Sequence, residues 1–204
     1  MIVKAMALGL GDLACILAAL LGERDILANS GQPMDTDIRS RVEILQKDGR
    51  GSSGEQSTTV PSLERLQRVN SEAQYWMKQF RIASGSVNSK DCGRVLAFAF
   101  PDRIAQRRAD GRYLLRNGRG ASFGERQALS EVPYLVAVEL DDSGADSRIL
   151  LVAPIELADI RSQFGGEIKE MTIVAWDGGT LSVRARYQER FGALILRDTL
   201  IANP

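Results

Sequence analysis

The sequence changes its hydrophobic periodicity close to residue 110, and this change restricts the fold more than any other feature. Before it, apolar residues recur at the three- and four-residue intervals of a helix face, whereas the runs after it alternate as strands do. The chain is therefore expected to belong to the α+β class. We expect a helical bundle over 1–109, followed by a small antiparallel β-barrel over 110–204.

Four helices are expected in the first half, over 11–23, 36–47, 61–82 and 89–99. The first carries an apolar stripe at helical spacing, formed by Leu13, Ile16, Leu17, Leu20 and Leu21. In the third, a stripe that ends in Trp76, Met77 and Phe80 indicates core packing and not a ligand site. The Gly/Ser/Thr-rich segment 48–59 has the composition of a mobile loop.

Pro101 interrupts this helical region. Because proline lacks an amide hydrogen and is favoured in a first turn, it predicts that the chain restarts as a short basic helix over 102–108. Asp110-Gly111 then leads into a series of strands, with one short helix expected over 155–163. The strands are expected over 113–116, 120–123, 134–140, 149–152, 171–176, 180–187 and 193–200. Asp177-Gly178-Gly179 indicates a hairpin turn between two of them.

Positive charge is concentrated where the helices give way to strands. From Arg94 to Arg119 there are seven arginines against two aspartates, a net charge of about +5. The formal net charge of the whole chain is nevertheless zero. Such a local field suits a polyanion. On composition alone, a solvated basic face is the simpler explanation.

The order of the motifs in this region resembles a known family. FAFPDRIAQRR (98–108), followed closely by YLLRNGRGA (113–121), resembles the bacterial HrpB family of DEAH-box RNA helicases. In that family the pattern lies where the helical helicase-associated (ratchet) domain passes into an OB-like β domain. The resemblance continues upstream in GDLACILAALLGERDIL and downstream in PYLVAVELD and RILLVAPIEL. It implies that the strands of the second half form an OB-like barrel.

The same resemblance implies that the chain helps to hold single-stranded RNA or DNA beside helicase motor domains of the same polypeptide. OB surfaces combine a basic groove with aromatic platforms on which bases stack. Tyr113 is a candidate platform, although it fits at least as well as a core aromatic residue. The candidate phosphate-binding residues are Arg107, Arg108, Arg112, Arg116 and Arg119. The competing interpretation is a protein–protein docking module that makes no direct contact with nucleic acid.

The sequence lacks the motifs of an ATPase motor. It has no G-x-x-x-x-G-K-[ST] loop to hold nucleotide phosphates and no Asp-Glu-x-His box to hold Mg²⁺. Histidine, the usual general base, is missing altogether, so no catalytic residue is assigned. We expect no cofactor in this chain, because ATP and magnesium would bind to a motor that the sequence does not contain.

The two cysteines and the apolar N-terminal segment complete the expectations. Cys15 and Cys92 have no second cysteine or histidine at ligand spacing, so buried free thiols are expected and a metal site is not. No segment approaches the roughly 20 apolar residues that span a bilayer. Asp12 interrupts the first apolar run, which also lacks a cleavage site for a signal peptide. We therefore expect a cytoplasmic protein without a membrane partner.

Overall fold

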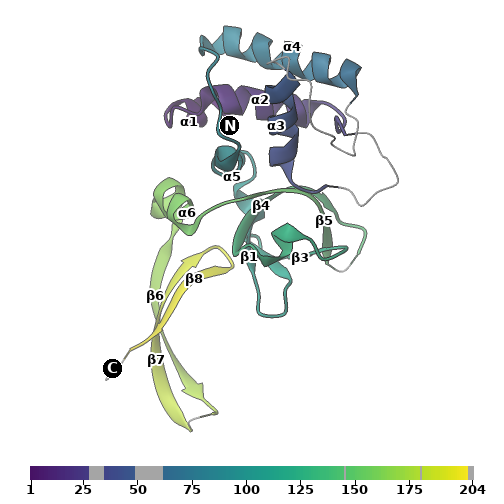
Figure 1. The fold of residues 1–204 in the computed structure, drawn as a ribbon. Helices are drawn as coiled ribbons and strands as arrows, with labels where there is room; N and C mark the ends of the chain where they lie inside the picture. Colours follow the sequence, from purple (N-terminus) through teal and green to yellow (C-terminus); the bar gives the residue numbers. More distant parts are fainter. Residues whose placement is uncertain (28–34, 49–61, 145, 180, 202–204) are drawn as a thin grey trace.

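The computed structural model of the chain describes residues 1–27, 35–48, 62–144, 146–179 and 181–201. A helical layer, a closed β-barrel and a three-stranded sheet follow one another in space, and the sheet projects away from the other two (Figure 1). The fold is therefore α+β, as the change in periodicity predicts.

The helical layer of the described residues contains α1 (Ile2–Met6), α2 (Gly11–Gly22), α3 (Ile38–Asp48), α4 (Leu63–Phe80) and α5 (Cys92–Leu96). Three of the expected helices correspond to α2, α3 and α4, whereas the sequence pattern does not anticipate α1. The helix expected over 89–99 is reduced to a 3₁₀ turn (Ser89–Asp91) and the short α5. The segment expected to be a mobile loop lies, except for its first residue, outside the described residues.

The apolar stripe of α4 is only partly buried. Its central residues Leu66, Val69 and Ala73 pack in one cluster with residues of α2. Trp76, Met77 and Phe80, near the C-terminal end, are half-buried. The core expectation is therefore confirmed at the centre of the helix and holds only in part toward its end.

Five strands close into the barrel: β1 (Ile104–Arg107), β2 (Tyr113–Leu115), β3 (Gly120–Phe123), β4 (Tyr134–Asp141) and β5 (Ser147–Pro154). Their order around the barrel is β1-β2-β3-β5-β4, and β1 pairs with β4 to complete the circle. β3 and β5 run parallel, while the other neighbours are antiparallel. A closed five-stranded barrel of this kind fits the OB-like arrangement that the resemblance implies.

The expectation of a basic helix over 102–108 is wrong. Only Pro101–Arg103 forms a single 3₁₀ turn, and strand β1 begins at Ile104. Ile104 and Ala105 are fully buried, and β1 pairs with two neighbouring strands at once. Two ladders of backbone hydrogen bonds and a buried face outweigh a local preference of less than about 1 kcal/mol per residue for the helix. The barrel thus starts within the range 1–109 that we expected to be helical.

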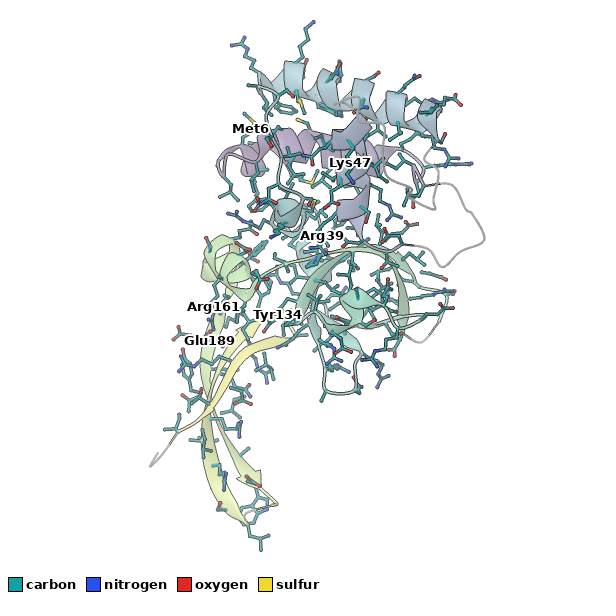
Figure 2. All side chains as sticks on the ribbon, in the orientation of Figure 1. Met6, Arg39, Lys47, Tyr134, Arg161 and Glu189 are labelled. Atoms are coloured by element: carbon teal, nitrogen blue, oxygen red, sulfur yellow. The ribbon has the colours of Figure 1, made fainter. Side chains whose placement is uncertain are left out.

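The last three strands form a sheet of their own outside the barrel: β6 (Lys169–Asp177), β7 (Ser182–Phe191) and β8 (Leu194–Leu200). Helix α6 (Leu157–Phe164) connects β5 to this second sheet. Figure 2 shows Arg161 of α6 beside Glu189 of β7, and their side chains form an ion pair of 2.7 Å. The sheet is therefore fastened to the rest of the molecule at the end nearest α6.

One apolar core joins the three layers. It contains Leu17 of α2, Val95 of α5, Val136 of β4, Phe164 of α6 and Phe191 of β7, all buried. A second cluster, which includes Ala105, Tyr113 and Leu115, fills the interior of the barrel. Because the first core crosses from helices to barrel to sheet, these elements hold one another in place.

The structure also bears on the membrane expectation. No helix among the described residues is both long enough and apolar enough to cross a bilayer.

Both thiols should resist alkylation in the folded chain. Cys15 and Cys92 are buried and free, and burial raises the pKa of Cys15 to about 11 and that of Cys92 to about 12. The thiolate is the nucleophile, and at about pH 8 no more than about one Cys15 side chain in a thousand is deprotonated. Iodoacetamide labelling followed by mass spectrometry should detect no adduct before unfolding and two in guanidinium chloride. Rapid labelling of either residue in the native chain would contradict this.

Candidate nucleic-acid interface

A hollow of about 500 Å³ opens at one end of the barrel. It is bordered by the β1–β2 connection, by the end of β3 with the residues that follow it, and by the 3₁₀ helix Ala128–Glu131. We call it the barrel-end hollow. The charged residues that line it are Arg107, Asp110, Arg112, Glu125, Arg126 and Glu131.

A tight turn between β1 and β2 positions the first of these side chains. Gly111 adopts a φ of 83°, which glycine tolerates because it has no Cβ. The amide of Arg108 donates to the carbonyl of Arg112 at 2.7 Å, and the Asp110 carboxylate accepts from the amide of Arg112 at 3.0 Å. The Asp110-Gly111 pair thus folds the chain back so that Arg107 and Arg112 border the same hollow.

Both of these arginines are already bound to protein groups. Arg107 Nε donates to the carbonyl of Ser130 at 2.7 Å, and its Nη2 lies 2.8 Å from Glu131 Oε2. Arg112 lies 2.9 Å from Asp110 Oδ2 and 2.9 Å from Asp146 Oδ2. A hydrogen bond from the backbone amide of Arg112, and a second one from its side chain, hold the pKa of Asp110 below its usual value. Asp110 is therefore charged at neutral pH and would compete with phosphate for Arg112.

Arg108 differs from its neighbours. Its side chain is exposed, and it makes no hydrogen bond or ion pair with any residue that the structure describes. It lies beside a smaller hollow of about 340 Å³ that also includes Arg107. Among the candidate arginines, Arg108 is thus the one that could bind a phosphate without first giving up a protein partner.

Arg116 does not lie at the barrel-end hollow. Its guanidinium stacks 3.9 Å from the centre of the Phe191 ring, and Nη2 lies 2.6 Å from Glu167 Oε2. Its carbonyl accepts a hydrogen bond from the amide of Ala193 at 2.9 Å. The residue connects the barrel to the second sheet, so its contacts are those of a structural joint.

Arg119 joins the β2–β3 turn to the β4–β5 connection. Its Nη1 lies 2.9 Å from Asp142 Oδ2 at an exposed position. The hydroxyl of Ser147 and, to a lesser extent, Arg119 keep the pKa of Asp142 below its usual value. This arginine too has a charged carboxylate partner at neutral pH.

Tyr113 cannot serve as a stacking platform, and that interpretation is wrong. Its side chain is fully buried, and its hydroxyl lies 2.9 Å from the carbonyl of Leu129 and 2.8 Å from that of Val132. Burial raises its pKa to about 12. Tyr113 alternates with Leu114 on β2 and points into the barrel, as the core interpretation requires.

Phe123 and Arg126 border the barrel-end hollow but are absent from the sequence-based candidates. Phe123 is half-buried and meets the Tyr113 ring edge-on, with centroids 5.8 Å apart and an angle of 87°. Arg126 is 84% exposed and lies 3.0 Å from Glu131. Phe123 ends an expected strand and could have been weighed as an aromatic candidate. Nothing in the sequence pattern indicates that Arg126 shares its site.

The hollow is electrically balanced, with three arginines against three carboxylates. No group of histidine, cysteine and carboxylate residues able to hold a metal ion occurs in the described part of the chain. The arrangement can therefore bind a polyanion only where phosphate takes the place of a carboxylate or meets Arg108. It offers one half-buried aromatic ring for a base.

The chain is similar in sequence to a known helicase. The ATP-dependent RNA helicase HrpB of Escherichia coli (strain K12) is 32% identical over 135 residues, which make up 65% of this chain and 17% of that protein. No protein-family model matches the chain.

Two solved structures share the fold. The crystal structure of the E. coli DExH-box NTPase HrpB matches with a TM-score of 0.65 and 26% identity. The crystal structure of the Escherichia coli DEAH/RHA helicase HrpB matches with a TM-score of 0.68 and 24% identity. Each match covers 95% of this chain and 21% of the other, so the chain spans about one fifth of the length of these relatives. The chain is therefore similar in sequence and in fold to a part of that helicase.

Proposed function

We propose that this chain is an accessory region of an HrpB-like RNA helicase and that it contributes to binding single-stranded RNA at the barrel-end hollow. The observation that carries the proposal is that exposed Arg126 and half-buried Phe123 border the barrel-end hollow of an OB-like barrel, while exposed Arg108 borders the smaller hollow beside it. The two hollows share Arg107 and Glu131. Arginines that track a backbone beside an aromatic ring are what a single-strand site requires. ATP and magnesium would then bind to motor domains of the same polypeptide, outside this chain.

The charges at the hollow set the strength of this binding. Phosphate contacts by Arg107 or Arg112 would each displace a carboxylate partner, so little free energy is gained there. Arg108 has no such partner among the described residues, and Arg126 has one exposed ion pair worth about 1 kcal/mol at most. The chain alone should therefore bind RNA weakly and with little preference for sequence, since backbone contacts position but do not specify.

Removing Arg108 and Arg126 should weaken this binding. In Arg108→Ala/Arg126→Ala, two phosphate contacts are lost, so the dependence of log affinity on log salt should flatten by about 0.7 per contact. The measurement is fluorescence anisotropy of a labelled oligouridylate of about twelve nucleotides, a length that one OB-like barrel can cover.

The control is Arg68→Ala, which removes one exposed arginine from α4. Figure 1 shows this helix on the side of the helical layer that is farthest from the barrel. This variant should keep the affinity and the salt dependence of the unmodified chain. If the double variant also keeps both, the barrel-end hollow is not the site of RNA binding.

One observation favours the alternative of a protein-docking module. Four of the five candidate arginines are held by carboxylates of the chain itself. A surface so neutralised suits a partner of mixed polarity better than a polyanion. The same titration separates the two functions, because docking through apolar contacts would leave RNA binding undetectable at every salt concentration.

A further inference from the structure

The outer edge of β6 is open. Within the described residues, β6 pairs with β7 on one side only, and the sheet order is β6-β7-β8. Seven of its nine residues are exposed, and Ile173 and Asp177 are half-buried. In Figure 1 this hairpin projects away from the barrel, so nothing in the described part of the chain covers the edge. An open edge presents unpaired amides and carbonyls to another strand.

The sequence of this edge lacks the devices that usually prevent such pairing. The six residues 171–176 carry no charge and no proline, and Val174 and Trp176 are each 64% exposed. Charged residues are found only at the two ends, with Lys169 and Glu170 at the start and Asp177 at the finish. Natural edge strands usually place a lysine, a proline or a bulge within the exposed stretch.

The strand is self-complementary when it runs antiparallel to itself. In a two-fold arrangement centred on Ile173, all nine residues have an opposite residue, and Lys169 of each copy faces Asp177 of the other. On the same face, Met171 meets Ala175 and Ile173 meets Ile173, so apolar pairs fill the centre. Opposite charges and apolar pairs directly across from each other both stabilise a sheet. A shift by two residues in either direction would lose both of the charged pairs.

We propose that β6 is a self-association surface, on which a second copy of this chain adds its own β6 antiparallel in the register centred on Ile173. The two sheets would then form one continuous six-stranded sheet across the two-fold axis. Asp177 already forms an ion pair of 3.2 Å with Arg184 of its own chain. In the dimer it would form a second ion pair, with Lys169 of the other copy. The surface lies on the second sheet, apart from the barrel-end hollow, so it does not depend on RNA binding.

A disulfide at the two-fold axis tests the register directly. The Cα atoms of two Ile173 residues would be about 4.5–5.5 Å apart in this pairing, within the range that a disulfide bridges. Ile173→Cys should therefore form a covalent dimer on mild oxidation, seen by non-reducing electrophoresis. The matched control is Ala175→Cys on the same face, because its two copies would lie about 14 Å apart and should not be cross-linked.

A charge exchange tests the ends of the pairing in the unmodified backbone. Lys169→Asp alone would place like charges opposite each other twice, and should raise the dissociation constant of the dimer about tenfold. Lys169→Asp with Asp177→Lys restores opposite charges and should recover the affinity of the original chain. Sedimentation equilibrium measures both, and circular dichroism shows whether each variant remains folded.

The outcomes separate clearly. Concentration-dependent dimers, cross-linking at 173 but not at 175, and recovery by the exchanged pair would support the proposal. A chain that stays monomeric at all concentrations would overturn it, and so would equal cross-linking at both positions. Self-association that none of the charge variants alters would place the contact elsewhere and reject β6 as the surface.

Discussion

Gly93→Ala should lower the free energy of unfolding by about 3 kcal/mol or more, because it forces a methyl group into the backbone of β5. Gly93 is buried in α5, and an added Cβ would lie 1.9 Å from the carbonyl oxygen of Pro154 and 3.1 Å from Ile155 Cβ. In a helix, alanine is favoured over glycine by at most about 1 kcal/mol. The clash therefore dominates, and urea denaturation followed by circular dichroism should show an earlier midpoint.

The control for this substitution is Gly165→Ala. Gly165 follows α6 with a φ of −52°, and an added Cβ would meet nothing within 4 Å. Its stability should be unchanged or raised by up to about 1 kcal/mol, because alanine restricts the unfolded chain. If Gly93→Ala were as stable as this control, α5 could not pack against β5 as closely as described.

Phe191→Ala should cost about 3–5 kcal/mol, since it removes the ring at which sheet, barrel and α6 meet. Phe191 is fully buried, its ring lies 5.3 Å from that of Phe164, and the guanidinium of Arg116 stacks on it at 3.9 Å. Truncation leaves a cavity and takes away the surface on which Arg116 rests. Besides the earlier urea midpoint, hydrogen exchange of the β7 amides should become faster.

Tyr75→Ala is the comparison for Phe191→Ala. It also removes a large aromatic side chain, but Tyr75 is 59% exposed on α4 and its loss leaves no cavity. The change in stability should be about 1 kcal/mol or less. Equal losses for the two variants would mean that Phe191 does not hold the layers together.

Local patterns were sufficient to predict much of the architecture. The helical stripe of α2 and the alternation of β7 can be recognised from neighbours a few residues away, because side chains at these spacings share a face. Asp110-Gly111 likewise predicts its turn from two adjacent residues. For the same reason the α+β class and the positions of most strands follow from the sequence.

Partners far apart along the chain decided what the patterns left open. The segment after Pro101 forms strand β1, and not a helix, because it pairs with both β2 and β4. The Tyr113 side chain lies inside the barrel, where its hydroxyl donates hydrogen bonds to carbonyls 16 and 19 residues away along the chain. Both outcomes depend on tertiary contacts that no local propensity encodes.

The basic segment shows why the sequence does not reveal which of its charges are neutralised. From the sequence it carries a net charge of about +5, yet Arg112, Arg116 and Arg119 find carboxylates 34, 51 and 23 residues away. Electrostatic attraction acts through space and falls with distance, whatever the separation along the chain. The sequence alone determined how many charges there are and where they lie along the chain. Only the folded chain decided which of them are neutralised and that Arg108 remains exposed.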